Sequence, residues 1–183
     1  MAEFVNIVPG RLWAVTDLLP PDQAAAILAT DWLNLSWDRG TKQESWSRRQ
    51  IAWSDPVAQR LGEYITQTLP EINSAVGTCF SRASGVFWVD EPGFTVAMHT
   101  DGHLPNSLQL YWNMPDNSTQ YGTGFYHSKN ADSLLYQFLS CANTGYIMLN
   151  HANQDGSQPL QWHGMFNPVP RATVRVTSYW QFA

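Results

Sequence analysis

Short apolar or alternating runs, separated by turn residues, are the feature that most constrains how this chain can fold. From about residue 76 onward such runs occupy residues 83–89, 94–99, 107–113, 124–127, 145–149 and 173–182. The breakers between them include Glu91-Pro92-Gly93, Met114-Pro115-Asp116-Asn117, Asp155-Gly156 and Asn167-Pro168. Many short strands with turn signals between them are typical of a β-sandwich or a jelly roll.

The first 75 residues have a different sequence pattern, which predicts short strands together with two helices. One signal covers residues 23–30, where Ile27 and Leu28 are the expected buried positions. In the other, Ser54 or Asp55 can cap a helix that has Pro56 in its first turn, and apolar residues recur at helical spacing at Val57, Leu61, Tyr64, Ile65 and Leu69. The 183 residues therefore predict one domain, 1–183, with a helix-containing N-terminal support (1–75) and a jelly-roll core (76–183).

The spacing of apolar residues in the segment 132–141 is ambiguous. Its apolar positions are Leu134, Leu135, Phe138 and Leu139. A short helix and a lid both remain open for this segment.

Charge and cysteine usage narrow the class of protein. The net charge is −5, and Arg48-Arg49 is the only adjacent basic pair, which disfavours nucleic acid as a partner. Cys79 and Cys141 fit no zinc spacing, and two unpaired thiols are favoured over one bridge between them. The N-terminus shows no signal peptide and no apolar run of about 18 residues occurs, so a soluble cytoplasmic protein is expected.

The strongest chemical signal is Met98-His99-Thr100-Asp101-Gly102. On an extended segment positions i and i+2 point to the same side, so His99 and Asp101 can converge on one point. Two histidines and a carboxylate on one face of a metal suit Fe(II) and leave positions open for a cosubstrate and O₂. All five histidines lie between residues 99 and 163, and His163 in Gln161-Trp162-His163-Gly164 is the candidate third ligand.

An ordered series of motifs completes the pattern between residues 85 and 182. It consists of Pro92-Gly93, His99-Thr100-Asp101, Leu110-Tyr111-Trp112-Asn113, Gly122-Thr123-Gly124-Phe125-Tyr126, Asn143-Thr144-Gly145-Tyr146-Ile147-Met148, Trp162-His163-Gly164, and Arg175-Val176-Thr177 before Trp180-Gln181-Phe182. In this order the motifs resemble the Fe(II)/2-oxoglutarate-dependent oxygenase superfamily, particularly its prolyl-hydroxylase-like branch. The resemblance implies a double-stranded β-helix and an oxidation coupled to decarboxylation of 2-oxoglutarate to succinate and CO₂.

The resemblance also implies a role for individual residues. His99, Asp101 and His163 would bind Fe(II). Arg175 would anchor the far carboxylate of 2-oxoglutarate with help from Tyr111 and Thr177, since a guanidinium binds a carboxylate through charge-assisted bonds.

The choice of anchor lies between Arg175 and Arg171. Arg175 is preferred because alternation places it on one face with Thr173, Thr177 and Tyr179, whereas Arg171 follows Pro170 in a predicted loop.

The remaining histidines and polar residues have simpler interpretations. His103 is read as a loop residue, His151 as a surface residue, and His127 as a surface histidine in preference to a substrate contact. Gln109 and Asn113 share the face of Tyr111 and are candidates to line the pocket, whereas Trp162 is expected to pack. Asp90 and Glu91 make a poor pair for acid–base catalysis, because adjacent residues on a strand face opposite ways.

The predicted function is hydroxylation by a dioxygenase with Fe(II), 2-oxoglutarate and O₂, with ascorbate as a stimulant. Peptidyl proline is the first guess for substrate, and a free amino acid or another small metabolite is the alternative; the sequence gives no oligomeric state. The rival hypothesis is a cupin-like jelly roll that binds a metal or ligand without oxygenase turnover. Such a binder has no need of Arg175 facing the metal.

Overall fold

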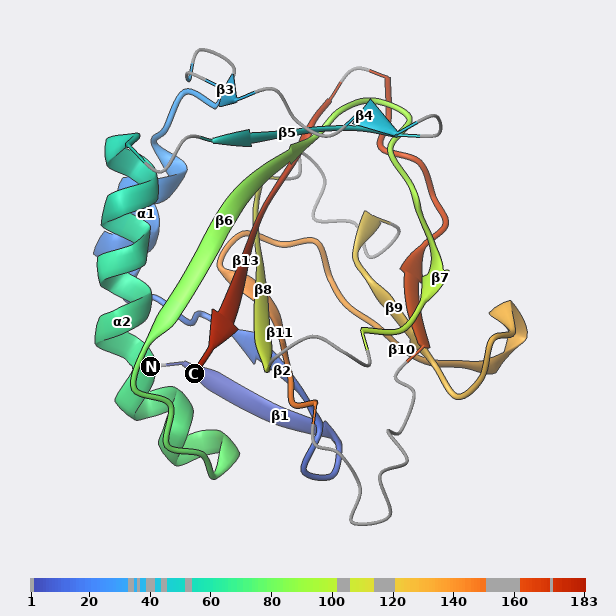
Figure 1. The fold of residues 1–183 in the computed structure, drawn as a ribbon, viewed down its shortest axis with the longest axis horizontal. Coiled ribbons are helices and arrows are strands. Elements are labelled where there is room, and N and C mark those ends of the chain that lie inside the picture. The colour runs from blue at the N-terminus through green and yellow to red at the C-terminus, as the bar shows by residue number, and fades with distance from the viewer. Residues whose placement is uncertain are drawn as a thin grey trace.

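Two antiparallel sheets face each other, and two helices cover the outer face of the larger one (Figure 1). These features come from a computed structural model that describes residues 2–32, 35, 37–38, 42–43, 46–51, 54–101, 106–113, 121–150, 162–171 and 173–183. The arrangement confirms the predicted jelly roll with N-terminal helices. Neither helix in this part of the chain has the length and apolar character needed to span a bilayer.

The larger sheet combines strands from both ends of the chain. In spatial order its strands are β1 (Glu3–Val8), β2 (Leu12–Thr16), β11 (Thr144–Met148), β8 (Ser107–Asn113), β13 (Arg175–Phe182), β6 (Ala83–Asp90), β5 (Trp46–Ile51) and β3 (Trp37–Asp38), with β4 (Lys42–Gln43) paired to β5. The smaller sheet has the order β10 (Leu134–Gln137), β9 (Gly124–Tyr126), β12 (Trp162–Met165) and β7 (Val96–His99). The N-terminal residues therefore supply strands to the same sheet as the jelly-roll core.

The helices are α1 (Pro21–Leu28) and α2 (Pro56–Val76). Asp55 caps α2, where its side chain accepts a hydrogen bond of 2.9 Å from the backbone N–H of Val57. The helical pattern read from the sequence stops at Leu69, but α2 continues past Pro70 because Ile72 and Val76 extend its buried face. The helix ends at Gly77, whose φ of 74° suits a residue without a Cβ.

The segment 132–141 contains a strand, so the expectation of a short helix is wrong. After a short 3₁₀ turn (Ala131–Ser133) the chain forms β10, an edge strand that pairs with β9. Exposed and half-buried residues alternate along Leu134–Gln137, which is the period of a strand with one face covered. The adjacent Leu134-Leu135 hides this alternation in the sequence.

Alternation along β8 divides the interior into two chemically different faces. Leu108, Leu110 and Trp112 belong to the apolar core beneath the helices, whereas Gln109 and Tyr111 point toward the smaller sheet. Both faces of this strand are covered, so its residues are buried with the exception of Asn113. Polar side chains thus collect between the two sheets.

Asn143 joins the N-terminal segment to the jelly roll. Its side-chain oxygen accepts from the backbone N–H of Leu19, and its side-chain amide donates to the Leu19 carbonyl, both at 2.9 Å. Asn143 adopts a φ of 59°, a left-handed conformation that asparagine tolerates better than most residues. The loop before β11 therefore holds the start of the first helical segment in place.

We expect Asn143→Ala to lower the free energy of unfolding by roughly 2–4 kcal/mol, because each buried backbone group left without a partner costs about 1–3 kcal/mol. Denaturant unfolding monitored by circular dichroism measures this. Asn130→Ala is the matched control, since Asn130 caps an exposed turn through Asp132. Equal losses for the two variants would contradict the role assigned to Asn143.

Candidate active site

The register between β7 and β12 places two of the predicted ligands face to face. His99 pairs directly with His163, although 64 residues separate them in the sequence. Asp101 follows β7 on the side of His99, as the i, i+2 argument predicts, and the three ligand atoms all lie within 4.8 Å of one another. Gly164 makes this close pairing possible, because a Cβ there would lie 2.9 Å from the carbonyl oxygen of Val96.

Both imidazole rings present Nε2 to the same carboxylate. Nδ1 of His99 lies 2.8 Å from the carbonyl oxygen of Ala97, so Nδ1 donates to that oxygen and Nε2 faces the cluster. The ring of His163 stacks on Phe125 at 5.2 Å between centroids. The two Nε2 atoms lie 3.5 Å from the two oxygens of Asp101.

Electrostatics keeps this carboxylate ionised. Burial opposes the charge of Asp101, but hydrogen bonds and the nearby charges of His163 and His99 outweigh it and hold the pKa of Asp101 well below its ordinary value. The hydrogen bond to Asp101 raises the pKa of His99 above its ordinary value, although partial burial acts against this. Two imidazoles and one ionised carboxylate are the donor set expected for a divalent transition metal.

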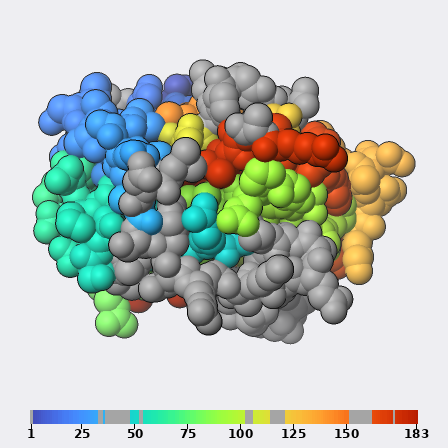
Figure 2. Space-filling model, turned by 90° about the horizontal axis from the view of Figure 1, so that it is seen from above, coloured from blue at the N-terminus to red at the C-terminus, as the bar shows by residue number. Residues whose placement is uncertain are grey.

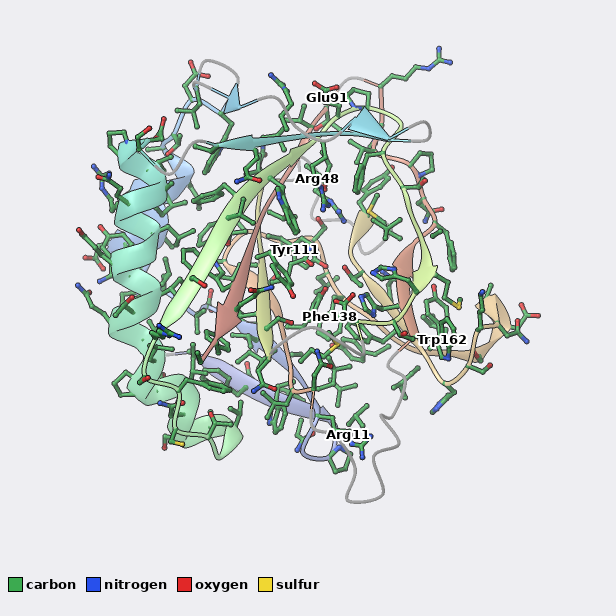
Figure 3. The ribbon with its side chains drawn as sticks, in the orientation of Figure 1. Arg11, Arg48, Glu91, Tyr111, Phe138 and Trp162 are labelled. Carbon is green, nitrogen blue, oxygen red and sulfur yellow. The ribbon has the colours of Figure 1, made fainter. Side chains whose placement is uncertain are left out.

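The cluster lines a cavity of about 180 Å³ between the two sheets. This volume is below the roughly 300–1,000 Å³ of pockets that hold drug-sized ligands, and it suits a small acid. The described lining residues are Arg48, Trp88, Val96, His99, Asp101, Gln109, Thr123, Tyr146, His163, Gly164, Met165, Arg175 and Tyr179. Figure 3 shows Arg48 and Tyr111 on the large-sheet side of the interior and Trp162 on the opposite side.

Two arginines that line the cavity belong to a row of charged side chains across three neighbouring strands. Asp90 pairs in register with Arg48 of β5 and with Arg175 of β13. Nε and Nη2 of Arg175 donate to Oδ2 of Asp90 at 2.8 and 2.6 Å, and Nε of Arg48 lies 2.5 Å from Oδ1. Burial lowers the pKa of Arg48 despite Asp90, but a guanidinium remains charged in proteins.

The structure separates the two candidate anchors. Arg175 is 1% exposed and lines the cavity of the histidine cluster. Arg171 is exposed and lines a different, shallower hollow, together with Thr173 and Asn113.

Tyr111 and Thr177, the two proposed helpers of Arg175, are buried beside the cavity but are not among the residues that line it. The hydroxyl of Tyr111 donates to Oγ1 of Thr123 at 2.8 Å and accepts from the Thr123 N–H at 2.8 Å, so Tyr111 holds a lining residue in place. Thr177 pairs with Trp88 and Tyr111, and its buried hydroxyl has no hydrogen-bond partner among the described residues.

The remaining sequence predictions have mixed outcomes. Gln109 lines the cavity and accepts a hydrogen bond of 2.8 Å from the hydroxyl of Tyr146. His127 is exposed, and Trp162 lies 5.6 Å from the ammonium group of Lys129. Both cysteines are free. His103 and His151 lie outside the described residues.

Sequence reasoning missed Arg48, Asp90 and Phe125 as parts of this site. Alternation already placed Asp90 and Glu91 on opposite faces, and the structure agrees, since Glu91 forms its ion pair with Arg49. The same alternation separates Arg48 from Arg49 on β5. The signal was not used because residues 46–51 were not recognised as a strand of the core sheet.

A divalent cation such as Ni²⁺ should raise the melting temperature of the wild type, because a ligand that binds only the folded state adds about 2.7 kcal/mol at one hundred times its Kd. His99→Ala should abolish this rise with little loss of packing, since the side chain is 42% exposed. His127→Ala, an exposed histidine elsewhere, should keep the rise. Thermal unfolding with and without the cation measures both.

We expect the rise in melting temperature caused by the cation to become smaller at acid pH. Protonated imidazole cannot bind a metal, and the raised pKa of His99 keeps it protonated to a higher pH than an ordinary histidine. The cation-induced rise should therefore shrink as the pH falls through that pKa. A rise that grew toward acid pH would contradict ligation by His99.

The sequence matches no protein-family model and no curated protein. The structure is nevertheless similar to a prolyl-4-hydroxylase from Pseudomonas putida, with a TM-score of 0.65 and 13% identity over 97% of this chain and 94% of that one. It is also similar to HygX from Streptomyces hygroscopicus with nickel, 2-oxoglutarate and hygromycin B bound (TM-score 0.59, 9% identity, 92% and 81% covered). A viral collagen prolyl hydroxylase from Paramecium bursaria Chlorella virus-1, in complex with 2-oxoglutarate, gives a TM-score of 0.55 at 12% identity, with 94% of each chain covered. The chain thus has the double-stranded β-helix fold of the prolyl-hydroxylase-like 2-oxoglutarate oxygenases.

Proposed function

We propose that this protein is an Fe(II)- and 2-oxoglutarate-dependent oxygenase that hydroxylates its substrate and releases succinate and CO₂. One observation carries the proposal: a His-Asp-His cluster and two arginines, Arg48 and Arg175, line one cavity. The cavity thus offers a metal site and a carboxylate site to a single small molecule.

The donor atoms fit Fe(II). His99, Asp101 and His163 provide two neutral nitrogens and one anionic oxygen, all drawn from one side of the cavity. This is the two-histidine, one-carboxylate set of non-haem iron oxygenases, which leaves coordination positions for a cosubstrate and O₂. When bound, the metal and 2-oxoglutarate would supply the oxidation chemistry, and the protein would supply binding and orientation.

The surrounding residues fit that supporting task. Arg175 is the proposed anchor for the far carboxylate, and Thr177, two residues along the same strand with an unsatisfied buried hydroxyl, is a proposed assistant. Tyr111 would act through Thr123 unless it exchanges that partner for the cosubstrate. Phe125 stacks on the ring of His163, and Gln109 and Tyr146 line the cavity, joined by a hydrogen bond from the Tyr146 hydroxyl to Gln109.

The likeness in fold supports the general reaction more than any substrate. Two of the similar proteins are named as prolyl hydroxylases, and one holds hygromycin B, a small molecule. We therefore propose either a peptide substrate, with proline as the first residue to test, or a small metabolite. Folds of this kind share cofactors more widely than they share targets.

A cupin-like binder without turnover is the rival function. It would explain a metal cluster in a jelly roll, but it gives no role to a buried guanidinium that lines the same cavity. The measurement that separates the two hypotheses is the consumption of 2-oxoglutarate.

We expect wild-type protein with Fe(II), O₂ and ascorbate to release succinate from 2-oxoglutarate, and His99→Ala to reduce the rate at least a hundredfold by removing one metal ligand. Arg175→Gln should weaken 2-oxoglutarate binding by about ten- to a hundredfold, since a hydrogen bond to a charged group contributes about 1.5–3 kcal/mol. Succinate is quantified by mass spectrometry.

Arg171→Gln is the matched control, because Arg171 is an exposed arginine outside this cavity. It should leave succinate release unchanged. Succinate at background in the wild type, with proline peptides and with small candidate substrates, would favour the cupin-like alternative.

A further inference from the structure

We propose that Arg48 is a second anchor for the cosubstrate and makes the site selective for a 2-oxo acid with a second carboxylate. The inference rests on the proposed function and assigns a binding residue from β5, outside the segment that carries the resemblance to the oxygenases. It arises from the way Arg175 is already held.

Arg175 has little hydrogen-bonding capacity left for a ligand. Its Nε and Nη2 both donate to Oδ2 of Asp90, and its Nη1 lies 2.7 Å from the carbonyl oxygen of Tyr121 and 2.6 Å from Sδ of Met165. These contacts account for four of its five N–H hydrogens. Arg175 alone therefore cannot offer the usual pair of N–H groups to an incoming carboxylate while it keeps these contacts.

The charge of the row supports a role for the second guanidinium. Asp90 is fully buried between Arg48 and Arg175, so these three side chains together carry two positive charges and one negative charge. Glu91, the neighbouring carboxylate, pairs with Arg49 on the other side of the strand and does not cancel this excess. A buried excess charge attracts an anion strongly, because the interior screens it less than water does.

The charged groups along the cavity together match a dianion. A divalent metal beside ionised Asp101 has a formal charge of +1, and Arg48, Asp90 and Arg175 together sum to +1. A 2-oxo acid with two carboxylates carries −2 at neutral pH, whereas a monocarboxylic 2-oxo acid of equal length brings no second negative charge to the two arginines. The charge count over the described lining residues thus favours the dicarboxylate.

Arg48 is also held in place before any ligand binds. Its guanidinium carbon lies 4.0 Å from the ring centre of Trp88 and 4.4 Å from that of Phe94, so the planar group is stacked against two aromatic rings. Backbone hydrogen bonds of Gly93 and Phe94 with Val169 tie this turn to the loop after β12. In Figure 2 the green segment that includes this turn lies beside the red C-terminal part of the chain. A guanidinium fixed in this way loses little conformational entropy when it binds a carboxylate.

The test compares two ligands by calorimetric titration of the Ni²⁺-loaded protein, which requires no turnover. The ligands are 2-oxoglutarate and 2-oxopentanoate, which has the same chain length and lacks the far carboxylate. We expect Arg48→Gln to weaken 2-oxoglutarate binding at least tenfold, about 1.4 kcal/mol, and to change 2-oxopentanoate binding less than twofold.

Arg49→Gln is the matched control, because this adjacent arginine points to the opposite face and pairs with Glu91; both affinities should stay unchanged. Arg48→Lys keeps the positive charge but lacks the planar guanidinium with its paired N–H donors, and it should retain part of the preference for 2-oxoglutarate. If Arg48→Gln fails to fold, Arg48→Lys carries the test, and an unchanged ratio of the two affinities in that variant overturns the proposal.

The remaining outcomes are distinguishable from one another. Equal weakening of both acids by Arg48→Gln would show a structural effect and overturn the role of Arg48, as would no weakening at all. Failure of the wild type to bind 2-oxoglutarate would instead remove the proposed function, and this inference with it.

Discussion

Antiparallel pairing of β7 with β12 brings His99 directly opposite His163 and so creates a point where three donor atoms meet. In an antiparallel pair the side chains of directly opposed residues lie on the same face, and a slip by one residue would turn one of the histidines to the other side. Gly164 permits the close approach of the β7 backbone, and Phe125 of the adjacent strand β9 supports the second ring. The register of two strands of the smaller sheet thus determines the geometry of the candidate metal site.

The larger sheet provides the complementary constraint. Arg48, Asp90 and Arg175 lie in one row across three hydrogen-bonded strands, so their charges are brought together by the sheet itself. Burying three charges is costly unless each is paired and hydrogen-bonded, and here Asp90 bonds both guanidinium groups while two aromatic rings cover Arg48. Arg48 and Arg175 of this row also line the cavity, which connects the stability of the row to its proposed role in binding an anion.

The two faces of the larger sheet have different roles, one in packing and one in lining the candidate site. The face toward α2 is apolar and packs with the helix, while the face toward the smaller sheet carries Gln109, Tyr111 and Arg175. Tyr111 shows how the polar face is kept in order, because its hydroxyl forms two hydrogen bonds with Thr123 and thereby positions a residue of the cavity wall. The helices therefore serve the site indirectly, by covering the apolar face so that the polar face can line a pocket.

The sequence alone was sufficient for features that depend on local periodicity. The i, i+2 spacing of His99 and Asp101 and the capped start of α2 follow from backbone geometry within a few residues, and the strand texture after residue 76 indicates the fold class. Alternation also predicted that Asp90 and Glu91 face opposite ways.

Only the tertiary structure decided which strands are neighbours. Periodicity states the side to which a residue points, but it does not name the partner strand, because any backbone can form the same hydrogen-bond ladder. For this reason the sequence did not predict Arg48 as a site residue, because its strand is far from the histidines along the chain. The strand at Leu134–Gln137 was likewise recognisable only from its pairing with β9.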